Sequence, residues 1–341
     1  MSSPEIDASQ LVAGAPAGES REWNWHPALP IDTSPVFEAP PRPFASLKWY
    51  LSAWLPISEL AIYVLIAIAV WMWLQPAPDL TQSLELWWVV AVWLRNIVMF
   101  TLVAAALHLW LYTWKKQGDA LRYDRRGPTA NARLYAFGSQ LWDNVAYSLL
   151  SGVTIWTFYE VGMWWGYANG WLPTVTLAGS PVWFVAWFVL IGIWYSFHFY
   201  CVHRFLHWGP MYRRFHSVHH RNIAVGPWSG FSMHPVEHVL YLSSLLIHLV
   251  VPSHPIHMLF HLYWLTLATA TSHSGYDALI LGKNARLAMG NFFHQLHHRY
   301  FECNYGNSEM PWDRWFGSFH DGTADGLAKV RARKKPISLR K

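Results

Sequence analysis

Eight histidines occur in three short sets with helical spacing: His203 and His207; His216, His219 and His220; and His294, His297 and His298. Residues three or four positions apart share one face of a helix, so we expect each set to present its imidazoles in one direction. Neutral imidazole is a common ligand of first-row transition metals. The three sets therefore indicate a metal centre, and we assign no catalytic residue beyond it.

A structural role is the alternative for any single histidine, which most often forms hydrogen bonds inside a protein core. Eight clustered imidazoles without metal would lack partners or become charged, and each unpaired buried polar group costs about 1–3 kcal/mol. Metal coordination removes that cost because it uses the lone pairs of the neutral rings. The number of histidines at this spacing favours the metal.

The number of candidate ligands indicates how many metal ions the site holds and which metal is favoured. One first-row ion uses about four to six positions, so eight ligands predict two ions. Zinc hydrolase sites usually have three protein ligands, often with a carboxylate, and the histidine surplus therefore favours iron. Imidazole also suits zinc, copper and nickel, so the spacing alone leaves the metal open.

The composition identifies the environment of the site. Of the 341 residues, 53% are hydrophobic and only 13% are charged, which leaves too little polar surface for a soluble globule of this length. The net charge of +5 comes from short loops and tails, so it does not indicate nucleic acid. Two cysteines exclude a disulfide framework, a thiolate zinc site and a four-cysteine iron–sulfur cluster.

Four apolar stretches could position the histidines, because each approaches the roughly 20 residues that cross a bilayer. They span residues 55–74, 86–110, 145–167 and 181–201, and the last leads directly into His203. A shorter apolar pair, 239–251 and 256–270, is joined by a Pro-Ser-His-Pro link. That pair could form two crossings or a re-entrant hairpin.

The lysines and arginines predict the orientation, since they favour the cytoplasmic side in short loops. Loops 75–85 and 167–180 contain none, whereas the loop 114–133 is rich in both. We therefore expect an integral, multi-pass protein whose histidine site faces the cytoplasm.

The predicted fold is an all-α, multi-pass transmembrane helical bundle with a cytoplasmic helical cap carrying the dimetal site. Residues 1–45 should form a disordered polar arm without a signal-peptide pattern. Residues 46–180 should hold the N-terminal transmembrane helices with the basic cytoplasmic loop, 181–322 the catalytic domain and 323–341 a basic C-terminal tail.

The three sets match the pattern H-x3-H, H-x2-H-H and H-x2-H-H in this order after a transmembrane helix. In this the chain resembles the fatty acid hydroxylase and sterol desaturase superfamily of membrane non-haem di-iron enzymes. Residues 303–306 (Cys-Asn-Tyr-Gly) and 312–317 (Trp-Asp-Arg-Trp-Phe-Gly) are similar to the stretch that closes the domain in that family. The resemblance covers about residues 185 to 320.

The resemblance also implies further site residues. Residues 271–277 (Thr-Ser-His-Ser-Gly-Tyr-Asp) are similar to a segment that supplies another histidine, which makes His273 a ninth candidate ligand. Some fatty acid 2-hydroxylases carry a histidine where this chain has Thr269. His234, Asp277 or water could complete the shell, and the structural alternatives for His234 are a helix cap or a hydrogen bond to a ligand imidazole.

By the same resemblance the protein holds two iron ions and uses dioxygen to hydroxylate or desaturate a C–H bond of a lipid. The segments at 271–277 and 303–306 favour the sterol-oxidising branch, although an acyl chain remains possible. No glycine fingerprint for a dinucleotide and no domain for flavin or haem is visible in the sequence, so electrons should come from a ferredoxin or a cytochrome with its reductase.

Two other classes of function were weighed. A zinc-dependent membrane lipid hydrolase could use the same ligands. A metal transporter would place its ligands near the membrane midplane, often with carboxylates, whereas these histidines follow the fourth crossing amid arginines.

Overall fold

The computed structural model describes residues 23–54, 58–129, 133–283 and 286–338. Its α-helices are α2 (Pro43–Trp54), α3 (Glu59–Ala69), α4 (Leu86–His108), α5 (Gln140–Ala146), α6 (Thr154–Ala168), α7 (Pro181–Leu206), α8 (Gly209–Met211), α9 (Ser217–His220), α10 (Pro235–Leu242), α11 (Pro255–Ser272), α12 (Phe292–Tyr300), α13 (Trp312–Trp315) and α14 (Ala324–Ser338). Turns of π-helix extend or join some of them: η1 (Val70–Leu74), η3 (Leu109–Thr113), η5 (Tyr147–Val153) and η6 (Tyr212–His216). Short 3₁₀ turns are η2 (Pro78–Leu80), η4 (Ala136–Gly138) and η7 (Ser243–Leu249).

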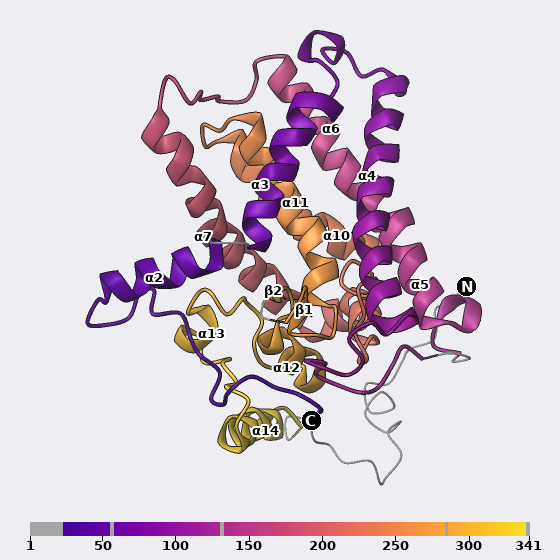
Figure 1. Ribbon diagram of the computed structural model, residues 1–341, viewed down its shortest axis with the longest axis vertical. Coiled ribbons are helices and arrows are strands. Elements are labelled where there is room, and N and C mark those ends of the chain that lie inside the picture. Colours follow the sequence, from indigo (N-terminus) through magenta and orange to yellow (C-terminus); the bar gives the residue numbers. More distant parts are fainter. Residues whose placement is uncertain (1–22, 55–57, 130–132, 284–285, 339–341) are drawn as a thin grey trace.

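Helix α11 is the centre of a bundle formed with α3, α4, α6 and α7, all of which it contacts (Figure 1). Most of its side chains are buried, including Leu259, Phe260 and Leu265. A helix that is apolar on every side is stable only when it is covered on every side. The surrounding helices provide that cover.

Helix α4 shows how the outer helices are built. Its buried side chains recur every fourth residue, starting at Trp88 and ending at Ala104, so one narrow face packs on the core. The opposite face exposes Leu94, Val98 and Leu102. A helix that is also apolar on its outward face needs an apolar surrounding, as a bilayer provides.

Two helices among the described residues are long and apolar enough to cross a membrane, Leu86–Thr113 and Pro181–Leu206. They coincide with the expected crossings 86–110 and 181–201. The expected crossing 55–74 contains the shorter apolar helix Glu59–Leu74, while residues 55–57 lie outside the described part. Residues 140–168 form the continuous helical run α5, η5 and α6. Full membrane crossings by residues 55–74 and 145–167 remain predictions.

The apolar pair that the sequence left open forms the hairpin of α10, η7 and α11. His254 caps the second arm, because its ring accepts a hydrogen bond from the Ile256 amide. Helix α10 packs against α6 and α7, so the hairpin lies inside the bundle and not beside it.

At the end of the bundle that holds α12, the chain forms a small cap (Figure 1). It includes an antiparallel pair of strands, β1 (Ala278–Ile280) and β2 (Arg286–Ala288), with Leu279 opposite Leu287. The all-α prediction therefore needs a small correction. The basic tail also forms a helix, α14, and residues 339–341 lie outside the description.

The predicted disordered arm is ordered from residue 23 onward, which is a second correction. The Trp23 ring packs on Phe292 and lies under the Arg299 guanidinium at 4.0 Å. The Asn24 amide donates to the Tyr123 carbonyl at 2.9 Å. The aromatic residues of this segment bury enough apolar surface to offset the entropy lost when the segment becomes ordered. The composition of the arm alone did not reveal these contacts. Residues 1–22 lie outside the described residues.

Candidate metal centre

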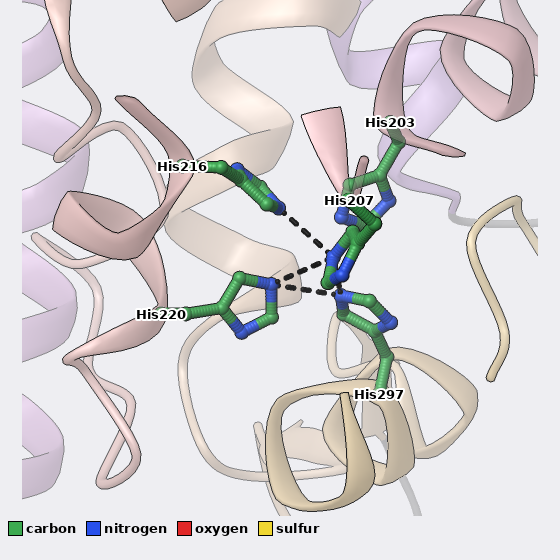
Figure 2. Close-up of side chains that lie close together, drawn as sticks. All are labelled: His203, His207, His216, His220 and His297. Atoms are coloured by element: carbon green, nitrogen blue, oxygen red, sulfur yellow. Dashed lines mark hydrogen bonds between the residues drawn. The ribbon is translucent and has the colours of Figure 1, made fainter. Parts of the chain in front are cut away.

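All nine histidines expected as ligands gather in two groups, and within each group the candidate ligand nitrogens lie within 4.8 Å of one another. The first group is His203, His207, His216, His220 and His297, and the second is His219, His273, His294 and His298. Figure 2 shows the first group, which unites the end of α7, the η6–α9 turn and α12. Segments almost a hundred residues apart thus meet at one point.

Each H-x2-H-H set contributes to both groups. His216 and His220, four residues apart, belong to the first group, whereas His219 belongs to the second. In α12 the arrangement is reversed: the outer two histidines of the set join the second group and His297 joins the first. Neighbouring residues on a helix point about 100° apart, so each His-His pair can serve two centres. The expectation that each set presents its imidazoles in one direction therefore fits His203 and His207, which share a group, but not the two H-x2-H-H sets.

The Nε2 atoms in the first group converge. His207 Nε2 lies 3.1 Å from His216 Nε2, 3.1 Å from His220 Nε2 and 3.2 Å from His297 Nε2, and the last two are 3.0 Å apart. In the second group the three Nε2 atoms of His273, His294 and His298 lie 3.0–3.1 Å from one another.

This spacing fits a metal ion. Two imidazole nitrogens bound at right angles to an ion at about 2.1 Å would be about 3.0 Å apart. Without an ion, converging lone pairs repel, and one proton on each ring can satisfy only one of several close contacts. The donor set and its spacing therefore suit one metal in each group.

The other ring nitrogen, Nδ1, is held by the protein in several of these residues. His203 Nδ1 lies 2.7 Å from the Tyr305 carbonyl and His297 Nδ1 lies 2.6 Å from the Cys303 carbonyl. A carbonyl can only accept, so Nδ1 carries the proton in both rings. Nε2 is then free to bind a metal. His273 Nδ1 contacts the Thr269 carbonyl at 3.1 Å in the same way.

Glu237 is a residue that sequence reasoning missed. Its buried carboxylate accepts a hydrogen bond from His216 Nδ1 at 2.7 Å. Metal-binding histidines commonly donate their second N–H to a carboxylate, and Glu237 lies three residues after His234 in the segment His-Pro-Val-Glu-His, residues 234–238. This common pairing of a ligand histidine with a carboxylate is the signal by which the sequence could have pointed to Glu237.

The two residues expected to complete the shell lie outside both groups. His234 caps α10, because its ring accepts a hydrogen bond from the Val236 amide at 3.2 Å. The Asp277 carboxylate accepts a hydrogen bond from the Tyr123 hydroxyl at 3.1 Å. His234 thus follows the helix-cap alternative, and Asp277 joins the strand region to the loop after α4.

Asp313 shapes the loop that carries the two site-facing carbonyls. Its carboxylate accepts hydrogen bonds from the amides of Tyr305 at 2.9 Å and Gly306 at 2.7 Å, and from the Ser318 hydroxyl at 2.6 Å. The Trp312 indole anchors the same region to α7 by donating to Ser196 Oγ at 3.0 Å. The two segments noted at 303–306 and 312–317 therefore act together to orient His203 and His297.

Burial keeps the site imidazoles neutral. It lowers the pKa values of His216, His220, His297 and His298 well below the ordinary histidine value, and the neighbouring imidazoles lower them further. The neutral ring is the form that binds metal.

Three histidines of the hairpin, His248, His257 and His261, lie outside the two groups. In the hairpin, His248 Nε2 lies 3.2 Å from His261 Nδ1, and His261 Nε2 lies 3.1 Å from Ser244 Oγ. His257 Nε2 donates to the Phe184 carbonyl at 2.8 Å. These bonds join the hairpin arms to each other and to α7.

A cavity of about 320 Å³ adjoins both groups. Five of the nine histidines line it: His203, His216, His219, His273 and His294. Its apolar wall includes Val189, Phe199, Leu206, Met233 and Trp264. The arrangement places an apolar molecule directly against both sets of ring nitrogens.

Comparison with known proteins agrees with this geometry. Residues 188–318, which contain all nine histidines, match the fatty acid hydroxylase family model. A Δ(7)-sterol 5(6)-desaturase of Eremothecium gossypii is 32% identical over 126 residues, 37% of this chain and 35% of the relative. The C-4 methylsterol oxidase erg25 of Schizosaccharomyces pombe is 29% identical over 262 residues, 70% of this chain and 83% of the relative.

The match to the desaturases spans about a third of their length. The match to the methylsterol oxidase extends beyond the histidine region into the N-terminal helices, since it covers 70% of this chain. No solved structure matches significantly. The family model over the histidine sets and relatives of both kinds support the assignment of residues 188–318 to the fatty acid hydroxylase and sterol desaturase superfamily.

Proposed function

We propose that this protein is a membrane-bound di-iron oxygenase that hydroxylates or desaturates a C–H bond of a sterol-type lipid, using dioxygen and external electrons. The observation that carries the proposal is the convergence of nine imidazoles in two groups beside one apolar cavity. A hydrolase would need neither so many histidines nor two all-imidazole centres.

One iron would be held in the group of five histidines and the other in the group of four. Two ferrous ions bound there would supply the reduction of dioxygen and the removal of hydrogen from an unactivated C–H bond. Iron is proposed over zinc because the relatives are named desaturases and oxidases.

The protein's own part is positioning and protection. Glu237 and the carbonyls of Cys303 and Tyr305 hold the rings with Nε2 directed inward. The buried site keeps bulk water away from the reacting carbon. The apolar wall holds the lipid in contact with the histidines.

We further propose that the lipid enters from the membrane surface near α2. In Figure 1 this helix lies beside the lower end of α3, which it contacts, and extends sideways from the bundle. It exposes Phe44, Leu47 and Leu51, while Trp49 and Tyr50 line the cavity. A helix with exposed apolar residues that extends sideways from a bundle suits the boundary of a bilayer.

The proposed electron donor is a ferredoxin or a cytochrome with its reductase, docking on the cytoplasmic side. Arg204, Arg213 and Arg214 are exposed close in sequence to the ligand histidines, and they give this face a positive charge. Acidic electron carriers are steered by such fields.

The test is turnover by the purified full chain supplied with NAD(P)H, a carrier system, dioxygen and a sterol. We expect about two irons per chain, and a product that has gained one oxygen or lost two hydrogens. A chain that holds zinc and consumes no dioxygen with either a sterol or a fatty acyl lipid would disprove the proposal. Oxidation of the acyl lipid alone would correct only the substrate.

A further inference from the structure

The cavity beside the histidines has one polar region that the metal site does not use. Alongside its apolar wall it is lined by Glu59 at the start of α3, Glu309 in the loop before α13, and Tyr50 of α2. These three side chains come from separate segments and face the same space. A purely apolar ligand would give none of these polar side chains a hydrogen-bond partner.

Their hydrogen bonds show which of them are free to bind a ligand. The Glu59 carboxylate accepts hydrogen bonds from the hydroxyls of Tyr63 and Thr271. By contrast, Glu309 Oε2 and the Tyr50 hydroxyl are buried and have no hydrogen-bond partner in the part of the chain that the structure describes. Buried polar atoms are almost always paired, so two neighbouring unpaired ones in a cavity wall indicate a polar ligand atom.

The protonation states define what that atom must be. Burial, with the nearby Glu309 as a second cause, raises the pKa of Tyr50 to about 12, so its hydroxyl remains a donor. Burial also raises the pKa of Glu309, whose carbonyl-type oxygen can accept in either protonation state. The wall of this cavity thus offers both a donor and an acceptor. A hydroxyl group both donates and accepts, and it matches this pair.

We propose that Tyr50 and Glu309 bind the hydroxyl group of a sterol, with Glu59 as the second carboxyl of the pocket. This rests on the proposed function and names the substrate class of the same site. A fatty acid would add a third carboxyl group to a poorly solvated space that already holds two, and the three could avoid repulsion between like charges only by taking up protons. A rigid apolar body with a single hydroxyl fits both parts of the cavity.

The position of this pocket also constrains where the substrate is attacked. Thr271, which bonds Glu59, precedes His273 by two residues, a rise of about 3 Å along the helix axis. Glu309 follows Tyr305, the partner of His203, by four residues. The hydroxyl pocket and the imidazoles therefore lie in one chamber. A sterol held by its hydroxyl in this pocket therefore has the ring system that carries the hydroxyl in the chamber that the imidazoles line.

The test is equilibrium binding to the purified, iron-loaded full chain, without reductant. The probes are a labelled 3β-hydroxysterol and its 3-deoxy analogue. We expect the hydroxysterol to bind at least tenfold more tightly, because the analogue leaves both wall groups unpaired. Glu309→Leu should reduce this preference to less than threefold and leave binding of the deoxy analogue unchanged or stronger.

Tyr50→Phe removes a single oxygen and should also weaken the preference. Glu85→Leu is the matched control, because it removes an exposed carboxylate before α4. Iron content and the size-exclusion profile report on folding for every variant. Equal binding of the two sterols by the unmodified chain, or an unchanged preference in both pocket variants, would overturn the proposal.

The assay needs neither electrons nor turnover, so its failure is separate from failure of the oxygenase assignment. A chain that prefers the hydroxysterol but lacks iron would uphold the pocket and contradict the proposed function. A chain that holds iron and oxidises lipid without a hydroxyl preference would do the reverse.

Discussion

Glu237 reaches the metal centre through one hydrogen bond, from His216 Nδ1. That bond keeps the proton on Nδ1, orients the ring and makes Nε2 a stronger ligand. The carboxylate is buried, and its second oxygen has no hydrogen-bond partner among the described residues. A charged group in such a place is costly unless the metal centre it supports carries positive charge.

The first prediction concerns this carboxylate. Glu237→Leu should lower iron affinity or turnover by about 10- to 100-fold, the usual cost of losing a group that orients a ligand. Glu237→Gln should cost less, because its amide oxygen still accepts from Nδ1. His234→Ala is the control, since His234 caps the same helix and its loss should affect mainly stability. Iron per chain and rate check this, and equal losses in Glu237→Leu and His234→Ala would contradict it.

The second prediction concerns His273, which only the resemblance pointed to and which the structure places in the group of four. His273→Ala should reduce iron from about two to about one per chain, with loss of turnover. His261→Ala removes an equally buried imidazole from the hairpin network. It should keep both irons and lose about 1–3 kcal/mol of stability. Metal analysis and thermal unfolding separate the two, and similar iron content in both variants would return His273 to a structural role.

At the scale of elements, Asp313 is a central hydrogen-bond acceptor of the closing loop. Asp313 accepts hydrogen bonds from two amides and a hydroxyl, and so it fixes the carbonyls that orient His203 and His297. The loop makes little regular structure of its own. Its shape is therefore as sensitive to Asp313 as a helix is to its cap.

The third prediction follows from that dependence. Asp313→Ala should destabilise the fold by roughly 2–4 kcal/mol, because several hydrogen bonds to a charged acceptor are lost. It should also lower iron occupancy, although Asp313 lies outside both ligand groups. Asp325→Ala, at an exposed carboxylate of α14, is the control. Unfolding temperature and metal content measured on the same samples test this, and full iron occupancy in Asp313→Ala would count against it.

At the scale of the whole molecule, the helical bundle and the cap have different roles. Two long apolar helices, α4 with η3 and α7, have the length for a membrane, and α7 delivers His203 at its last turn. The cap closes over the histidines from the other side. Exposed arginines close in sequence to the ligand histidines give this side of the molecule a positively charged surface.

The fourth prediction tests that surface. Arg213→Glu together with Arg214→Glu should lower kcat/KM for an acidic carrier by about tenfold or more at low salt, because charge steering is lost. Raising the salt should lower the turnover rate of the unmodified chain toward that of the variant. Salt screens the attraction between the two proteins, and the Debye length is about 8 Å at physiological ionic strength. Lys329→Glu on α14 is a charge-matched control. Sustained turnover without any carrier, or a variant with unchanged rates at low salt, would refute this docking site.

The sequence by itself determined which residues form the centre. Eight of the nine gathered histidines followed from helical spacing, because spacing along a helix is a local property that the chain carries with it. The ninth, His273, came only from family resemblance. Two long apolar helices were equally visible, since length and composition suffice to identify them.

Tertiary structure alone decided how those residues are used. His219 and His220 are neighbours in sequence but belong to different groups, as do His297 and His298, and this division depends on which helix faces which. The partners of the rings, Glu237 and the carbonyls of Cys303 and Tyr305, come from segments distant in the chain. So do the three residues of the hydroxyl pocket, Tyr50, Glu59 and Glu309. Periodicity reports the direction of a side chain relative to its own helix, whereas a binding site is defined by directions relative to other helices, which only packing sets.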